Sequence, residues 1–178
     1  MKKIAFFTVL FLACSAYSQT TPAEKPTLRS ILLAQMKETH NQKEWFVPAN
    51  VAVAGLTADQ ANWKDGKGNH SVGQLAYHLV YWDTRSLEKF KGEPTPKFSG
   101  NNDETFDNFD SKKWDETVRQ LDAVLTEWEK AIATADDAKL EQWASDIEKI
   151  SAHNAYHIGQ IIYVRKEQGS WNPENGVK

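Results

Sequence analysis

One stretch of the sequence places an apolar residue at every third or fourth position over about twenty residues. Its members are Trp114, Val118, Leu121, Leu125, Trp128 and Ile132. This spacing puts all six side chains on one face of an α-helix. A helix with one apolar face must bury that face against other elements. We therefore expect a helix from about residue 111 to about residue 134, packed along one side.

Three other segments share this spacing and carry residues that begin or end helices. Thr27 and Ser71 are good N-caps, whereas Pro48 and Gly92 stop helices. The predicted helices span about residues 27–47, 71–91, 111–134 and 146–168.

The connections between these helices show little strand pattern. Residues 48–70 and 92–110 are rich in turn residues, and three phenylalanines can anchor the second of them. Residues 135–145 are expected to hold one short helical turn near Trp143. The sequence therefore predicts an all-α fold, a four-helix bundle with a long crossover connection.

The first eighteen residues have the features of a secretory signal peptide. Lys2 and Lys3 precede an apolar run, and Ala16 and Ser18 are small residues suited to cleavage after Ser18. The run is too short for a stable transmembrane span. We expect an exported, periplasmic or extracellular protein. A lipoprotein attached through Cys14 is a second interpretation, although the preceding residues fit a lipidation site poorly.

These features divide the chain into four parts. The predicted parts are a signal peptide (1–18), a flexible leader (19–26), the bundle (27–170) and a C-terminal tail (171–178).

Removal of the signal peptide changes the available chemistry. Cys14 is the only cysteine, so the mature chain would have no disulfide, cysteine nucleophile or thiolate ligand. Loss of two lysines takes the formal charge from -3 to -5. An acidic chain without a basic run is a poor candidate for binding nucleic acid.

Two histidines lie on the apolar face of the last predicted helix. Ile150, His153, His157, Ile161 and Val164 recur at steps of three and four. Side chains four apart on a helix are about 5–6 Å apart, so both imidazoles can bind one ion. The alternative is a pair of hydrogen-bonded core histidines, since an unpaired buried polar group costs about 1–3 kcal/mol.

His78 is the candidate third ligand, because it lies between Leu75 and Trp82 on the apolar side of the second predicted helix. Three neutral imidazoles suit zinc, nickel, copper or iron, and three protein ligands leave positions open for water or substrate. His40 and His70 lie in polar, turn-like sequence and are expected to be solvated, although His40 is on a core helix and can approach the site.

Several catalytic motifs are absent. No glutamate follows His153, as it does in zinc proteases, and no Glu-x-x-His occurs, as in di-iron bundles. A Gly-x-Ser-x-Gly elbow and a phosphate-binding glycine loop are also missing. If the protein is an enzyme, a metal must carry the chemistry by activating water or a thiol, or by polarising a substrate oxygen.

Two motifs in this order resemble the DinB/YfiT-like superfamily. They are SVGQLAYHLVYWDTRSLEKFKGE and, much later, ISAHNAYHIGQIIYVRKEQG. The resemblance covers about residues 27–169 and implies a four-helix bundle with one divalent metal on His78, His153 and His157. Gly159 and Gln160 belong to the second motif. Gly159 can allow a close helix contact, and Gln160 can support a histidine or face solvent.

The resemblance leaves several functions open. Characterised relatives include metal-dependent transferases and isomerases that use bacillithiol, mycothiol or glutathione, which are cytoplasmic thiols, whereas this chain is expected to be exported. We expect one divalent transition metal (zinc, nickel or iron) and a small-molecule substrate or ligand, in a metal-dependent hydrolase or thiol-dependent transferase. A non-catalytic metal- or ligand-binding bundle and a bundle without metal are the alternatives.

Two further points concern the site and the assembly. Asp83 can support the site as an acid, but a solvated position on the helix is the preferred interpretation. Related bundles are often dimers, and the amphipathic patterns leave both a monomer and a homodimer open.

Overall fold

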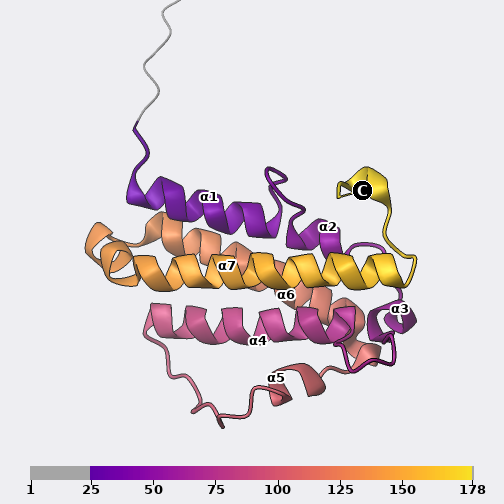
Figure 1. Cartoon of the computed structure of the whole chain (residues 1–178). Helices are drawn as coiled ribbons and strands as arrows, with labels where there is room; N and C mark the ends of the chain where they lie inside the picture. Colours follow the sequence, from indigo (N-terminus) through magenta and orange to yellow (C-terminus); the bar gives the residue numbers. More distant parts are fainter. Residues whose placement is uncertain (1–24, 178) are drawn as a thin grey trace, which may run out of the picture.

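The computed structural model describes residues 25–177, and within this range the chain is helical with no strand. No helix in the described range is both long and apolar enough to cross a membrane. The expected fold class is confirmed, because the long helices pack together as a bundle (Figure 1). These are α1 (Leu28–His40), α4 (Val72–Lys91), α6 (Trp114–Thr134) and α7 (Asp137–Glu167).

The long helices occupy the four corners of the bundle. Both α1 and α4 pack against α6 and α7, so α1 lies diagonally across from α4. In Figure 1, α1 and α7 run from left to right, whereas α4 and α6 run from right to left. Because α4 and α6 are parallel neighbours, the chain between them must return along the bundle. Residues 92–113 form this crossover connection, as expected.

The core draws on all four long helices. Trp128 is fully buried, and its indole N–H donates to the backbone carbonyl of Asp83 at 3.1 Å, which joins α6 to α4. The other large, fully buried apolar side chains of these helices are Met36, Leu79, Leu121, Leu125, Ile132, Leu140, Ile147, Ile158 and Ile161.

The predicted caps of α1 and α4 are present. The hydroxyl of Ser71 accepts from the Gln74 N–H at 3.2 Å, and the Gln74 side chain accepts from the Ser71 N–H at 3.1 Å. Thr27 and Ser30 form the same reciprocal pair at the start of α1. Gly92 ends α4 with φ of 78°, in the left-handed region that glycine adopts without strain.

The first helix is shorter than the sequence predicted. α1 ends at His40, and Asn41 caps it with an N–H that donates to the Lys37 carbonyl at 2.9 Å. Trp45, which lies within the predicted range of about 27–47, is outside the helix and 92% exposed. Pro48 instead caps the short helix α2 (Ala49–Val53).

The last helix is longer than predicted, so the expectation of a short turn near Trp143 is wrong. α7 begins at Asp137, where the side chain of Asp136 accepts from the Lys139 N–H at 2.8 Å. Leu140 and Ile147 are buried and extend the apolar face of the histidine helix by more than two turns.

Short helical segments fill the connections. They are α3 (Ala58–Asn62), α5 (Glu104–Asp107) and the 3₁₀ turns η1 (Ser111–Lys113) and η2 (Pro173–Asn175). Phe106 of α5 is buried, and Phe98 and Phe109 are half-buried, so the phenylalanines anchor the crossover as expected.

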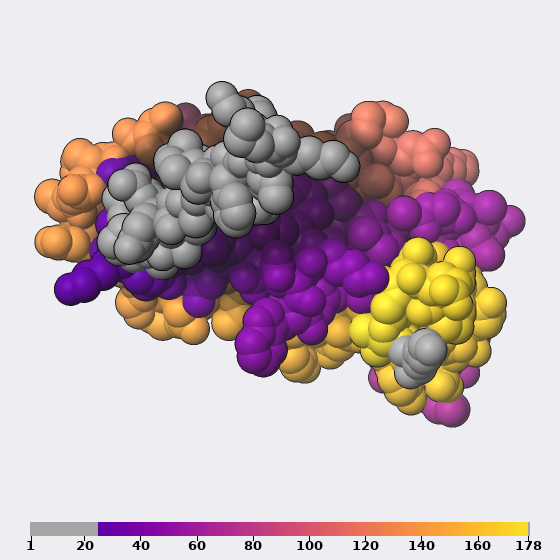
Figure 2. All heavy atoms as spheres, turned by 90° about the horizontal axis from the view of Figure 1, so that it is seen from above, coloured from indigo at the N-terminus to yellow at the C-terminus, as the bar shows by residue number. Residues whose placement is uncertain are grey.

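The chain after α7 folds back at one end of the bundle, where Figure 2 shows it in yellow. The buried ring of Trp171 lies 5.1 Å from the Arg165 guanidinium, and its N–H donates to the Gly176 carbonyl at 3.0 Å. The predicted signal peptide (1–18), with Cys14, and leader residues 19–24 lie outside the described residues.

The close contact is made by a different glycine from the one considered in the sequence, and its partner lies in the crossover connection. A Cβ on Gly159 would meet nothing within 4 Å, so the expected packing role of Gly159 is wrong. A Cβ on Gly73, in the first turn of α4, would come within 2.2 Å of the Phe109 ring. The ring of Phe109 therefore occupies the space that a side chain would need.

This difference predicts opposite effects for the same substitution. Gly159→Ala should stabilise the protein by about 0.5–1 kcal/mol, because alanine is the better helix former and its methyl group meets open space. Gly73→Ala should destabilise it by about 1–3 kcal/mol, because displacement of the ring outweighs the gain in helix propensity. Urea unfolding of both variants beside the parent checks this, and a stabilised Gly73→Ala variant would contradict it.

Candidate metal centre

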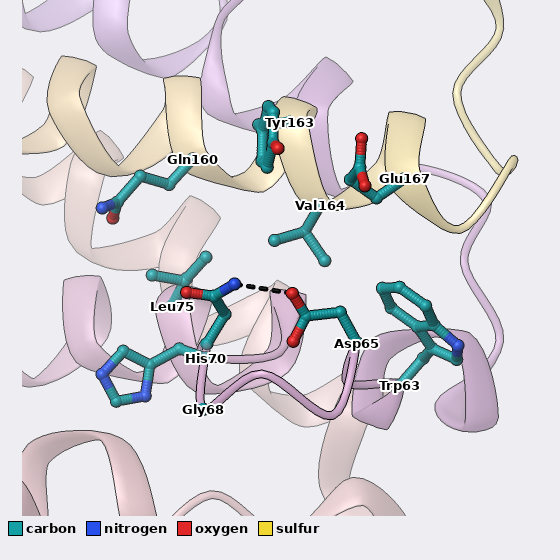
Figure 3. Close-up of a pocket in the computed structure, with 10 residues that line it drawn as sticks. Trp63, Asp65, Gly68, His70, Leu75, Gln160, Tyr163, Val164 and Glu167 are labelled. Atoms are coloured by element: carbon teal, nitrogen blue, oxygen red, sulfur yellow. Dashed lines mark hydrogen bonds between the residues drawn. The ribbon is translucent and has the colours of Figure 1, made fainter.

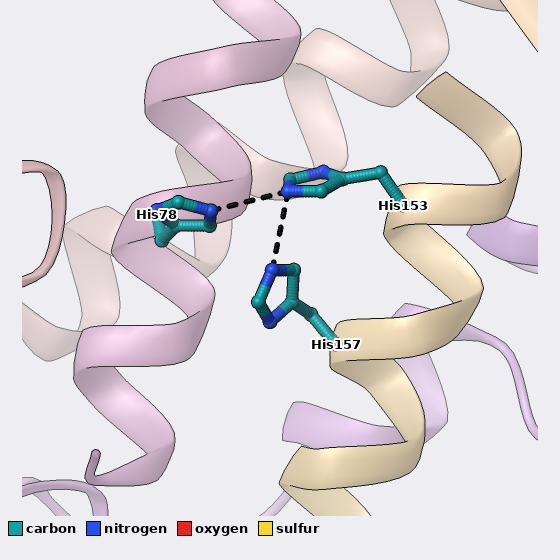
Figure 4. A group of neighbouring side chains, drawn as sticks. All are labelled: His78, His153 and His157. Carbon is teal, nitrogen blue, oxygen red and sulfur yellow. Dashed lines mark hydrogen bonds between the residues drawn. The ribbon is translucent and has the colours of Figure 1, made fainter. Parts of the chain in front are cut away.

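Three histidine side chains meet between α4 and α7, and Figure 4 shows their rings pointing toward one another. The Nε2 atom of His153 lies 3.1 Å from Nε2 of His78 and 3.1 Å from Nε2 of His157. One potential ligand atom from each lies within 4.8 Å of the others, and no other such group of His, Cys, Asp or Glu occurs in residues 25–177. The structure thus brings the three predicted residues together.

Hydrogen bonds fix the direction in which two of the rings present a lone pair. Nδ1 of His78 lies 2.6 Å from the hydroxyl of Thr105, which itself donates to the carbonyl of Asn102 at 2.6 Å. Thr105 has a single proton, so it accepts from His78. Nδ1 of His157 likewise donates to the Gln160 side-chain oxygen at 2.6 Å. Both rings therefore present the unprotonated Nε2 to the centre of the cluster.

The rings are held in the neutral form that binds metals. Burial, followed by the neighbouring His157 and His153, lowers the pKa of His78 to about 3. Burial and then His153 lower the pKa of His157 to about 4. The pKa of His153 is also lowered by burial, although a hydrogen bond with Asn154 acts the other way. Neutral imidazole is the ligand form, so no proton must leave before a cation binds.

A cavity of about 420 Å³ opens beside the three histidines. Trp82, Phe106 and Ile150 give it apolar walls, and Lys149 is the only lysine or arginine that lines it. The volume suits a small organic molecule. A three-nitrogen site next to open space matches catalytic metal sites, which keep a coordination position free, better than closed structural sites.

Asp83 is buried beside the site, so the preferred interpretation of a solvated residue is wrong. Its side chain is 1% exposed, and it lines the cavity. The amide of Asn154, which follows His153, donates to Oδ1 of Asp83 at 3.1 Å. Burial raises the pKa of Asp83 to about 7, with the Asn154 hydrogen bond acting in the opposite direction. Through Asn154, α4 and α7 are linked directly behind His153.

His70 is half-buried, in contrast to the predicted solvated position. Its ring stacks on Phe106 with centroids 3.9 Å apart, and the other face of Phe106 stacks on His78, also at 3.9 Å. The interplanar angles of 5° and 6° show that the three rings are nearly parallel. Phe106 is therefore a spacer that holds the His78 ring from the side of the crossover.

His40 is also buried, and it does not take part in the site. Its Nδ1 lies 2.5 Å from Glu129 and its Nε2 lies 3.0 Å from Asp122, both on α6. Asn50 donates to the same Asp122 oxygen at 2.9 Å. The polar residues around His40 in the sequence suggested solvent, but its partners are carboxylates from a neighbouring helix. These contacts connect α1 to α6.

A family model described as the DinB superfamily matches residues 49–162, well over half of the chain and all three histidines. The chain belongs to the DinB superfamily. No curated protein matches the chain, and no solved structure matches it. Membership in the DinB superfamily and the three-histidine cluster are compatible with divalent metal binding.

The supporting residues of this DinB site were only partly visible in the sequence. The sequence places Gln160 in a motif and leaves two roles open for it. In the structure its side chain contacts His157 and so supports a histidine. Thr105 and Phe106 were missed, because the crossover that carries them has no periodicity. Asn154 was also missed. The only signal for it in the sequence is its position directly after His153, on the side of the helix that faces the core.

The buried Asp83 predicts a pH dependence of stability in the metal-free protein. Its folded pKa of about 7 exceeds the ordinary value of 3.8, so the folded state holds the proton more tightly. Protonated Asp83 therefore stabilises the folded state. This contribution is fully present below the ordinary pKa and is lost as the pH rises through the folded pKa.

Asp83→Asn should remove this loss, because asparagine cannot ionise and can still accept from Asn154. Between about pH 5 and about pH 7.5, the free energy of unfolding of the variant should increase relative to that of the parent. The increase should be at most about 1.4 kcal/mol per pH unit. Urea unfolding in the presence of a chelator measures the difference. Parallel stability profiles for the two proteins would show that Asp83 does not titrate as described.

Proposed function

We propose that this protein binds one divalent transition metal through His78, His153 and His157 and acts on a small molecule held in the adjoining cavity. The observation that carries the proposal is the convergence of three neutral imidazoles beside a cavity of about 420 Å³. The donor set fits zinc, nickel or iron, because all three metals accept imidazole nitrogen. When bound, such a metal supplies Lewis-acid activation of water, a thiol or a substrate oxygen.

Other side chains have distinct roles in this proposal. Thr105 and Gln160 hold the Nδ1 protons of His78 and His157, so the rings cannot turn away from the centre. Trp82, Phe106 and Ile150 present apolar walls to a bound substrate. The ammonium group of Lys149 favours a substrate with a negatively charged or strongly polar group.

Two reaction classes fit this arrangement, a metal-dependent hydrolysis and a thiol-dependent transfer. A cavity favours either class over simple metal storage, because storage requires no space for an organic molecule. A panel of esters, amides and thiol-conjugation substrates, tested with and without metal, separates the two. If no substrate turns over in a metal-dependent way, a non-catalytic ligand-binding bundle becomes the better proposal.

The first prediction concerns metal content. Purified protein should contain close to one transition metal per chain by elemental analysis, also after reconstitution with zinc, nickel or iron. A variant with both His153→Ala and His157→Ala should contain none, because a single imidazole holds such ions weakly. His40→Gln is the control, since His40 is a buried histidine outside the cluster, and this variant should retain the metal. An empty parent protein after reconstitution would remove the proposal.

The second prediction concerns the support of His78. Thr105→Val keeps the shape of the side chain but cannot accept the Nδ1 proton, and should weaken metal affinity about 10–100-fold. Thr105→Ser keeps the hydroxyl and should remain close to the parent. Competition with a chromophoric chelator measures both affinities. Equal affinities for the valine and serine variants would mean that Thr105 does not orient the ligand.

We also propose that the protein is exported, on the basis of the signal-like residues 1–18. Expression of the full chain in a Gram-negative host should yield periplasmic protein that begins at Gln19, as measured by N-terminal sequencing. Lipidated protein that begins at Cys14 would favour the lipoprotein interpretation, and uncleaved cytoplasmic protein would contradict export.

A further inference from the structure

A second cavity, of about 320 Å³, lies between the end of α7 and the loop that precedes α4 (Figure 3). It shares no lining residue with the histidine cavity. Leu75 and Val164 give it an apolar floor, and Trp63 and Tyr163 add two aromatic rings. Its volume is within the range of small-ligand sites.

The charged groups of this second cavity all have one sign. Asp65 comes from the loop and Glu167 from the last turn of α7, and no lysine or arginine lines the cavity. Figure 3 shows the two acidic side chains on different elements, Asp65 on the loop and Glu167 on α7. A cavity with this lining repels anions and attracts cations.

The carboxylate of Asp65 is held in place before any ligand arrives. Its Oδ1 accepts from the Lys67 backbone N–H at 2.8 Å, and its Oδ2 accepts from the Asn69 amide at 2.6 Å. These two hydrogen bonds lower the pKa of Asp65, so it stays ionised. Each oxygen can accept a second hydrogen bond, so the carboxylate remains available to a ligand.

Glu167 differs from Asp65 in having no fixed partner. Within residues 25–177 its carboxylate forms no hydrogen bond or ion pair, although it lies at the edge of the cavity. The described residues contain no metal-type cluster that includes either carboxylate. Two separated carboxylates on aromatic and aliphatic walls suit a large, weakly hydrated cation better than a metal ion.

We propose that this cavity binds a small organic cation, an amine or quaternary ammonium compound. The ammonium group would lie between the carboxylates and the faces of Trp63 and Tyr163, which attract cations through the ring quadrupole. The aliphatic part of the ligand would cover Leu75 and Val164. This inference goes beyond the proposed metal-dependent function and does not rest on it.

Calorimetric titration with choline and with ethanolamine tests the proposal, and 3,3-dimethylbutan-1-ol provides an uncharged isostere of choline. At least one amine should bind with a Kd of about 5 mM or tighter, and the isostere at least about tenfold more weakly. The His153→Ala, His157→Ala double variant should bind the amine equally well, so failure of the metal site cannot mask this result.

Two variants locate the bound amine. Glu167→Gln should weaken binding about threefold to fivefold through loss of charge. Trp63→Leu, which keeps an apolar side chain for folding, should weaken it by a similar factor through loss of the ring face. Glu148→Gln is the matched control, because Glu148 is also exposed on α7 but lies outside this cavity, and should bind as the parent.

Three results would overturn the proposal. They are no saturable binding of either amine up to about 50 mM, equal affinity for the uncharged isostere, and unchanged affinity in both the Glu167 and the Trp63 variants.

Discussion

The contact between α4 and α7 forces three imidazole rings into the interior of the bundle, and much of the surrounding structure serves to hold them there. Two of the rings already donate their Nδ1 protons to Thr105 and Gln160, so their Nε2 atoms can only accept. Nε2 of His153 lies 3.1 Å from both of these acceptors and carries at most one proton. That proton can therefore satisfy only one of the two Nε2 lone pairs. A single cation would satisfy all three rings together, because each could then direct a lone pair at positive charge.

Bundle topology explains why the support for His78 comes from the crossover. Since α4 and α6 are parallel neighbours, residues 92–113 must travel the length of the bundle to join them. This path carries α5 past the outer side of His78. Thr105 fixes the ring by a hydrogen bond and Phe106 by stacking at 3.9 Å. A connection that closes the fold thereby also completes the site.

The helices and the three histidines could be predicted because both depend on spacing within one segment. Ser71 as a cap, the end of α4 at Gly92 and the shared face of His153 and His157 are local features of the sequence. His40 and Asp83 were misjudged because their burial depends on other helices, on the carboxylates of α6 in one case and on Asn154 in the other. The early start of α7 was missed because Trp143 was treated as an isolated turn, although Leu140 and Ile147 continue the same face.

The two cavities differ in their charged lining, although Asp83 adds one acidic group to the histidine cavity. Lys149 lines the histidine cavity, whereas Asp65 and Glu167 line the other. Two residues contact the groups that support the histidines. Gln160 holds His157, and His70 stacks through Phe106 on His78. Both residues also line the acidic cavity. Each therefore connects the second cavity to the surroundings of a cluster histidine. Residues of a chemically different pocket therefore help to orient His157 directly and His78 through Phe106.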